Sequence, residues 1–256
     1  MVAGGILGQL LGRLMPHYRE DTATREAITL ATTLVITVTS LTLSLLLYST
    51  KTAFDTAEAN TRAYAASIIV LDRALNAYGP EAQQARMLLR GYTERALRST
   101  WPEESGGSKR SVPIESRVLG RELVVLHDAI RHFHSADPYK EVLAAECRGN
   151  MNALVGRRFA LVEDVRRSIP PLLMGAVITW LAVIFVSLGL NTSNNPAVMM
   201  ATLGVCALVA ASCITLMDEM DGAFDGLIKV SSGPMRDALA NLGSDADTGD
   251  QSAPAR

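Results

Sequence analysis

Cysteines are few in this sequence, and their spacing argues against a disulfide framework. The three are Cys147, Cys206 and Cys213, and no Cys-x-x-C pair occurs. Cys206 and Cys213 lie seven positions apart in one apolar run, which places them on one face of a helix and excludes a bridge between them. Free thiols and an odd count are typical of a chain that faces a reducing cytoplasm.

Catalytic and metal-binding motifs are also missing. The sequence contains no Gly-rich phosphate loop, nucleophile elbow, paired-carboxylate motif or His-Glu-x-x-His motif. His127, His132 and His134 lie near Glu122 and Asp128 in the sequence, but only Asp128 and His132 are one helical turn apart. A zinc site needs several ligands that converge at fixed spacings. We interpret these residues as a solvated helix face, and we expect no enzyme, no metal site and no cofactor.

Clustered positive charge is the third feature that is missing. Residues 50–169 contain 18 lysines and arginines against 15 aspartates and glutamates. Nucleic-acid-binding domains usually carry a strongly basic face, so we expect no nucleic-acid partner. The last part of the chain, 218–256, is acidic, with eight acids and three bases.

Three long runs without a charged residue dominate the sequence, at 27–49, 170–190 and 196–217. A helix of about 20 residues spans the roughly 30 Å hydrocarbon core of a bilayer. Lipid offers the backbone no hydrogen-bond partners, so each run must be helical. The sequence therefore predicts an all-α integral membrane protein with three complete transmembrane helices. We interpret the apolar residues 1–12, which are too short to cross, as the remnant of a further first span.

The positive-inside rule orients these spans. Lys51 follows the first full span, four arginines precede the second, and the loop 191–195 has no charge. We therefore expect a cytoplasmic helical domain at 50–169 and extracytoplasmic loops at 13–26 and 191–195. The tail 218–256 would be cytoplasmic and disordered from about residue 243. This topology predicts a multi-pass protein of the bacterial inner (cytoplasmic) membrane, with the lipid bilayer as its first partner.

The cytoplasmic domain is expected to consist of helices alone. Apolar positions recur at helical spacing over 52–78, 81–100, 115–135 and 139–168, and no strand-like alternation occurs. A Ser-, Gly- and Pro-rich loop is predicted at 102–113. The first of these helices is expected to continue from the preceding span without a break.

Hydroxyl side chains recur along the first full span at spacings of three and four residues. At about 100° per residue they fall within an arc of about 80°. Two interpretations are open. The stripe could line a water-filled pathway in which hydroxyl dipoles solvate an ion, or it could allow close helix–helix packing with hydrogen bonds across the interface. The residues are Thr29, Thr33, Thr37, Ser40 and Ser44.

A cluster of acids follows the last span. Asp218, Asp221 and Asp225 have spacings that place them on one face if the helix continues. In a symmetric oligomer they would form a ring of carboxylates at the inner mouth, which would attract cations. The alternative is a solvated turn in which Gly222 and Gly226 end the helix.

The ordered motifs of the chain resemble the bacterial bestrophin-like membrane proteins, a family with a domain of unknown function. They include Leu14-Met15-Pro16-His17 before the first full span, KTAFDTAEANTRAYAASIIVLDRALNAYGPEA after it, and Ile169-Pro170-Pro171-Leu172 at the second. The closing stretch EMDGAFDGLIKVSSGPMRDAL is similar to the family pattern L-D-R-P-F-x-G-x-I-x-(V/I)-S-S-x-P. The matching positions are Met220, Asp221, Phe224, Gly226, Ile228, Val230, Ser231, Ser232 and Pro234. Gly222 and Ala223 replace the arginine and proline of the pattern.

This resemblance implies four spans, with a cytoplasmic helical domain between the second and the third. It also implies self-association and, by analogy with bestrophins, a homo-oligomeric channel for an inorganic ion. Bestrophins carry bulky apolar residues at the pore neck, where this chain has threonines and serines. The alternative function is a non-conducting membrane scaffold or sensor whose cytoplasmic helices bind a partner.

Overall fold

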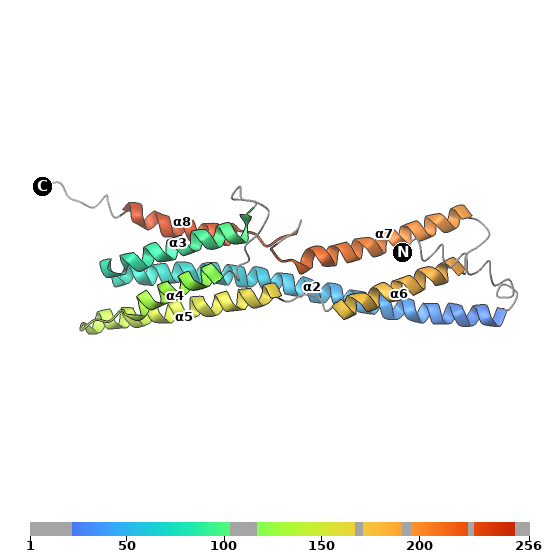
Figure 1. Cartoon of the computed structure of the whole chain (residues 1–256), viewed down its shortest axis with the longest axis horizontal. Helices are drawn as coiled ribbons and strands as arrows, with labels where there is room; N and C mark the ends of the chain where they lie inside the picture. Colours follow the sequence, from blue (N-terminus) through green and yellow to red (C-terminus); the bar gives the residue numbers. More distant parts are fainter. Residues whose placement is uncertain (1–21, 103–116, 167–170, 191–195, 225–227, 249–256) are drawn as a thin grey trace. The chain divides into compact units, whose positions relative to one another are not determined.

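The computed structural model describes residues 22–102, 117–166, 171–190, 196–224 and 228–248. The chain divides into two compact units, one of residues 1–53 and 168–221 and the other of residues 54–167 and 222–256. We call the first the span unit and the second the bundle unit. All regular structure in the described part of the chain is helical, as the sequence predicts (Figure 1).

The span unit contains the three helices that are long and apolar enough to cross a membrane. They are the N-terminal part of α2 (Thr22–Tyr78), α6 (Pro171–Leu190) and α7 (Pro196–Asp221). α6 and α7 each begin with a proline, which is favourable at the first position of a helix because its missing N–H would have no partner there. The unit has two small buried apolar clusters. One consists of Phe185 and Leu203, and the other of Leu46, Val177, Leu181, Ile184, Ala210 and Met217.

The helix α2 runs for 57 residues and contributes to both units. No glycine or proline occurs between its ends, so nothing in the sequence interrupts its backbone hydrogen bonds. The continuity expected after the first span is therefore observed. The helix ends at Tyr78 because Gly79 takes a positive φ of 112°, a conformation that other residues rarely adopt, and Pro80 follows.

The bundle unit is built from the C-terminal part of α2 and five shorter elements. These are η2 (Pro80–Ala82), α3 (Gln83–Thr100), α4 (Arg117–Arg131), α5 (Pro138–Arg166) and α8 (Gly233–Thr248). α3 packs against α4 and α8, and α4 packs against α5 (Figure 1). One apolar core joins them, with fully buried members from α2, α3, α4 and α5 such as Ile68, Leu89, Leu126 and Leu154.

The turn between α4 and α5 shows why α4 ends before its predicted limit at 135. Asp137 caps α5, since its carboxylate accepts a hydrogen bond from the Tyr139 amide at 3.0 Å and its carbonyl accepts one from the Glu141 amide at 2.9 Å. Pro138 then occupies the first position of α5. Residues 132–137 are therefore needed for the turn.

The C-terminal helix α8 differs from the expected tail. Met235, Ala238 and Leu242 are buried against the bundle at helical spacing. The Ser232 carbonyl accepts hydrogen bonds from the Met235 and Arg236 amides, both at 3.0 Å, and so starts the helix. α8 continues to Thr248, later than the predicted onset of disorder near 243. The buried side chains of Met235, Ala238 and Leu242 hold the helix against the bundle as far as residue 242.

Candidate functional site

The hydroxyl stripe lies on the span-unit part of α2, and all five of its side chains are exposed. The Thr33 hydroxyl donates to the Thr29 carbonyl at 2.8 Å, and the Thr37 hydroxyl donates to the Thr33 carbonyl at 2.9 Å. The Ser44 hydroxyl donates to the Ser40 carbonyl at 2.8 Å. A hydroxyl has one hydrogen and two lone pairs, so these three residues present acceptor oxygens to their surroundings.

Three different faces follow one another around this part of α2. At about 100° per residue, the hydroxyl stripe covers an arc of about 80° and a leucine stripe covers the next 60° or so. The leucines are between 62% and 72% exposed. The opposite face is the one that packs within the chain, where Thr39, Leu46 and Thr50 are buried. The leucine stripe consists of Leu30, Leu34, Leu41 and Leu45.

Two of the three acids of the cluster, Asp218 and Asp221, lie in the last turn of α7. α7 ends at Asp221, and Gly222 and Ala223 leave the helix. Asp218 is exposed and Asp221 is half-buried, while Asp225 lies outside the described residues. Of the two alternatives, the end of α7 at Asp221 agrees with the one in which Gly222 ends the helix. Among the described residues, no group of three His, Cys, Asp or Glu side chains converges as a metal site would require.

The closing motif folds back onto the bundle unit through Trp101, at the end of α3. The Trp101 indole Nε1–H donates to the Val230 carbonyl at 2.8 Å, and the Phe224 ring meets the indole edge-on at 5.6 Å. Val230 in turn donates its amide to the Ala223 carbonyl at 2.8 Å. Trp101 is 3% exposed. Sequence reasoning missed it, because 129 residues separate Trp101 from Val230.

Other members of the motif have separate roles. Ser232 is buried and begins α8, while Ser231 is exposed and its hydroxyl accepts a hydrogen bond from the Gly233 amide at 3.1 Å. Pro234 lies in the first turn of α8. Gly226, like the predicted first-span remnant 1–12, lies outside the described residues.

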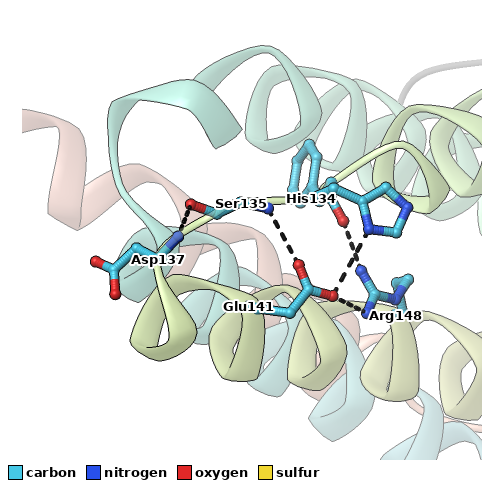
Figure 2. Close-up of polar contacts among 6 residues, drawn as sticks. His134, Ser135, Asp137, Glu141 and Arg148 are labelled. Carbon is cyan, nitrogen blue, oxygen red and sulfur yellow. Dashed lines mark hydrogen bonds and ion pairs between the residues drawn. The ribbon is translucent and has the colours of Figure 1, made fainter.

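The histidine cluster is dispersed, as the spacing indicates. His127 contacts Asn152 at 3.2 Å and His132 contacts Asp128. His134 instead lies 3.6 Å from Glu141, at the turn between α4 and α5 (Figure 2).

Glu141 organises this turn. Its carboxylate accepts a hydrogen bond from Arg148 at 2.8 Å and one from the Ser135 amide at 3.1 Å (Figure 2). Arg148 also donates to the Phe133 carbonyl at 2.5 Å. The Arg148 hydrogen bond is the main reason that the pKa of Glu141 lies below its usual value. These contacts stabilise the turn. The Tyr78 ring also stacks on the Phe133 ring there, with the ring centroids 4.7 Å apart.

The bundle interior contains polar groups that sequence reasoning also missed. The hydroxyls of Tyr64 and Tyr92 lie 2.5 Å apart in the core. Burial raises the pKa of both groups, that of Tyr64 well above its usual value. The Arg86 guanidinium donates two hydrogen bonds to the Asp72 carboxylate, at 2.8 and 3.0 Å. This ion pair links α3 to α2. The i, i+4 and i, i+3 spacing of buried positions along α2 could have placed Tyr64 and Asp72 in the core.

A family model identifies the family of this chain, and a solved structure shows its fold. The model of the bestrophin-like domain matches residues 1–235 of the chain. Among solved structures, a crystal structure of a mutant bacterial bestrophin homolog from Klebsiella pneumoniae is similar, with a TM-score of 0.66 at 11% sequence identity. The match covers 94% of this chain and 97% of that chain. At this identity the likeness shows a shared fold. No curated protein matches the sequence.

Proposed function

The chain belongs to the bestrophin-like family, and from this premise we propose that it forms a homo-oligomeric ion channel in the bacterial inner membrane. The Klebsiella pneumoniae structure is described as a bestrophin homolog, and this chain shares its fold over almost its whole length. The observation that carries the proposal is the hydroxyl stripe of α2, which is exposed and turns acceptor oxygens outward.

The three faces of α2 support an oligomer. The leucine stripe suits contact with lipid tails, and the face of Leu46 is already occupied within the chain. Hydroxyls gain nothing from lipid, so we place the stripe toward other copies and toward water between them. The span unit buries little of its apolar surface within one chain, which also favours further helix partners in the assembly.

The hydrogen bonds that the hydroxyls make within their own helix favour a cation over an anion. Thr33, Thr37 and Ser44 use their single hydrogen on their own helix. Their outward lone pairs can replace the hydration oxygens of a cation, whereas an anion would need the hydrogens. We therefore propose a monovalent cation as the permeating ion, with Asp218 and Asp221 as acids that raise its local concentration near the end of α7.

Ion currents test this proposal directly. Purified protein in planar bilayers should show unitary currents whose reversal potential follows a Na⁺ or K⁺ gradient. Thr37→Leu should reduce the unitary conductance because a branched apolar side chain replaces an oxygen ligand. Leu41→Ile, on the leucine stripe, is the matched control and should leave conductance unchanged. Silent bilayers under cation and chloride gradients alike would contradict the proposal.

A non-conducting scaffold or sensor remains the second candidate, because small hydroxyl residues also permit close helix packing. Cysteine accessibility separates the two functions. In a channel, Thr33→Cys and Thr37→Cys should react with a charged, water-soluble thiol reagent, while Leu34→Cys should not. Protection of both stripe positions in an oligomer would favour the scaffold.

A further inference from the structure

The outer faces of α4 and α5 carry most of the large apolar side chains that the bundle unit exposes. Nine such side chains are described in this unit, and six of them lie on these two helices. Val124 is 66% exposed and Phe159 is 64% exposed. The six are Val118, Val124, Val125, Tyr139, Val142 and Phe159.

Two contacts set the relative position of the two helices. His127 of α4 meets Asn152 of α5 at 3.2 Å, and a Cβ on Gly120 would lie 3.8 Å from the Arg158 guanidinium. The helices therefore run antiparallel, and Val124 lies between these two contact points, on turns adjacent to Phe159. Several large apolar side chains exposed beside charged ones, as on these two faces, are typical of a protein interaction site.

The charges on the two faces are opposite in sign. The outer face of α4 carries three exposed arginines and Asp128, while that of α5 carries two exposed glutamates and Arg157. Within the described part of the chain, the structure gives no ion-pair partner to the three arginines or to the two glutamates. They are Arg117, Arg121 and Arg131 on α4, and Glu146 and Glu163 on α5.

The spacing of these charges also matches. At 1.5 Å per residue, Arg117 and Arg131 are about 21 Å apart along α4, and Glu146 and Glu163 are about 26 Å apart along α5. The difference is about one helical turn, which long arginine side chains can absorb. One α4 face is thus complementary to one α5 face in both charge and length.

The face of α5 is open to close approach. Gly149 and Gly156 lie in the middle of a 29-residue helix, where glycine is unfavourable, and a Cβ on either would meet no atom within 4 Å. Nothing within the described chain requires glycine at these positions. A neighbouring helix could approach closely there, with its side chains set between Val142 and Phe159.

We propose that, in the assembled protein, the outer face of α4 of one copy packs against the outer face of α5 of the next copy. The inference rests on the proposed homo-oligomer and names the part of the bundle unit that joins its subunits. Because the two faces differ, each copy uses one face toward each neighbour, and the contacts can close into a ring. Valines of α4 cover Phe159, and arginines of α4 pair with Glu146 and Glu163 at the rim.

Disulfide trapping between two differently tagged full-length chains tests the contact. Both chains carry Cys206→Ser and Cys213→Ser and keep the buried Cys147. One chain carries Val118→Cys and the other Phe159→Cys, at positions that the antiparallel register places at one level. Mild oxidation of the oligomer in detergent should yield a mixed dimer on denaturing gels. The control pair, Val70→Cys with Met87→Cys, is exposed on α2 and α3, and it should yield at least tenfold less.

Charge exchange provides a second test. Arg117→Glu and Glu163→Arg, which the antiparallel register places at one level, should each reduce the oligomeric fraction severalfold, as measured by mass photometry in detergent. The double variant should restore at least half of the lost assembly, which a folding defect would not do. Arg73→Glu, on the exposed face of α2, is the control for a simple change of charge.

The outcomes distinguish this inference from the proposed function. An oligomer that conducts ions, but gives no mixed dimer and no rescue by charge exchange, would overturn the inference and leave the channel standing. Fast labelling of Phe159→Cys by a water-soluble maleimide in the intact oligomer would overturn it too, as would a cross-link to lipid or to another protein only. A wild-type chain that is monomeric at all concentrations would overturn both.

Discussion

Removal of Arg86 should be one of the most destabilising single changes in the bundle unit. Arg86 holds the Asp72 carboxylate with two hydrogen bonds, and it donates a third to the Asn76 side chain at 2.9 Å. The Asp72 side chain is only 6% exposed. Arg86→Met keeps an unbranched apolar stem but leaves a buried carboxylate without its cation.

The magnitude follows from burial. Breaking a buried ion pair by removing one partner costs about 3–5 kcal/mol. The Arg86 side chain is 21% exposed, so water can partly replace it, and we expect the lower end, about 3 kcal/mol. For a protein of this size that loss corresponds to about 6–12 °C in midpoint temperature.

Trp101 fluorescence provides the assay, because this indole is buried in the same unit. Urea and thermal unfolding in detergent would be followed in a Trp180→Phe background, which leaves Trp101 as the single reporter. The double variant Asp72→Asn with Arg86→Met should recover most of the lost stability, because no buried charge is then left without a partner. Arg90→Met, exposed on the same helix, should cost less than about 0.5 kcal/mol. An Arg86→Met midpoint equal to that of Arg90→Met would refute the reasoning.

Three further predictions concern buried groups of the bundle unit. Trp101→Phe keeps an aromatic ring at this position but removes the indole N–H that donates a hydrogen bond to the Val230 carbonyl. It should cost about 1–3 kcal/mol and speed tryptic cleavage after Lys229; unchanged cleavage would contradict the anchoring role. The protein should lose stability as pH rises above about 10, because tyrosines of the unfolded chain then ionise while the raised pKa values keep Tyr64 and Tyr92 neutral in the fold. A double phenylalanine variant should show a flatter pH profile in urea titrations. Cys147, whose pKa burial raises to about 11, should react with Ellman's reagent only upon unfolding in a chain without the other cysteines, and rapid reaction of the folded chain would be inconsistent with its burial.

Much of the fold could be predicted from the sequence because it depends on local chemistry. The long apolar runs coincide with three helices able to cross a membrane, and the resemblance to the bestrophin-like family is confirmed by the match over residues 1–235. Gly79, Pro80 and Pro138 end or begin helices because of their own backbone restrictions. The order of α2, α3, α4 and α5 follows from these signals.

The candidate site was only partly predictable. Helical periodicity brings Thr33, Thr37 and Ser44 to one arc, and a threonine or serine inside a helix often donates to its own i−4 carbonyl. For the acids, local chemistry indicated both alternatives, a continued helix or an end at Gly222, and α7 ends at Asp221. The hydroxyl stripe and the acids stay proposals for ion binding.

By itself the sequence determined which segments are helical, where they end and which are apolar enough for lipid, because these properties sum over neighbouring residues. Tertiary structure alone decided the pairings between distant residues. Trp101 meets Val230, Asn60 donates to Asp164 at 2.5 Å across 104 residues, and α8 is ordered by the core it covers. Such contacts depend on which faces of the helices pack together. The packing of the whole core determines these pairings, and residues near one another in the sequence do not specify them.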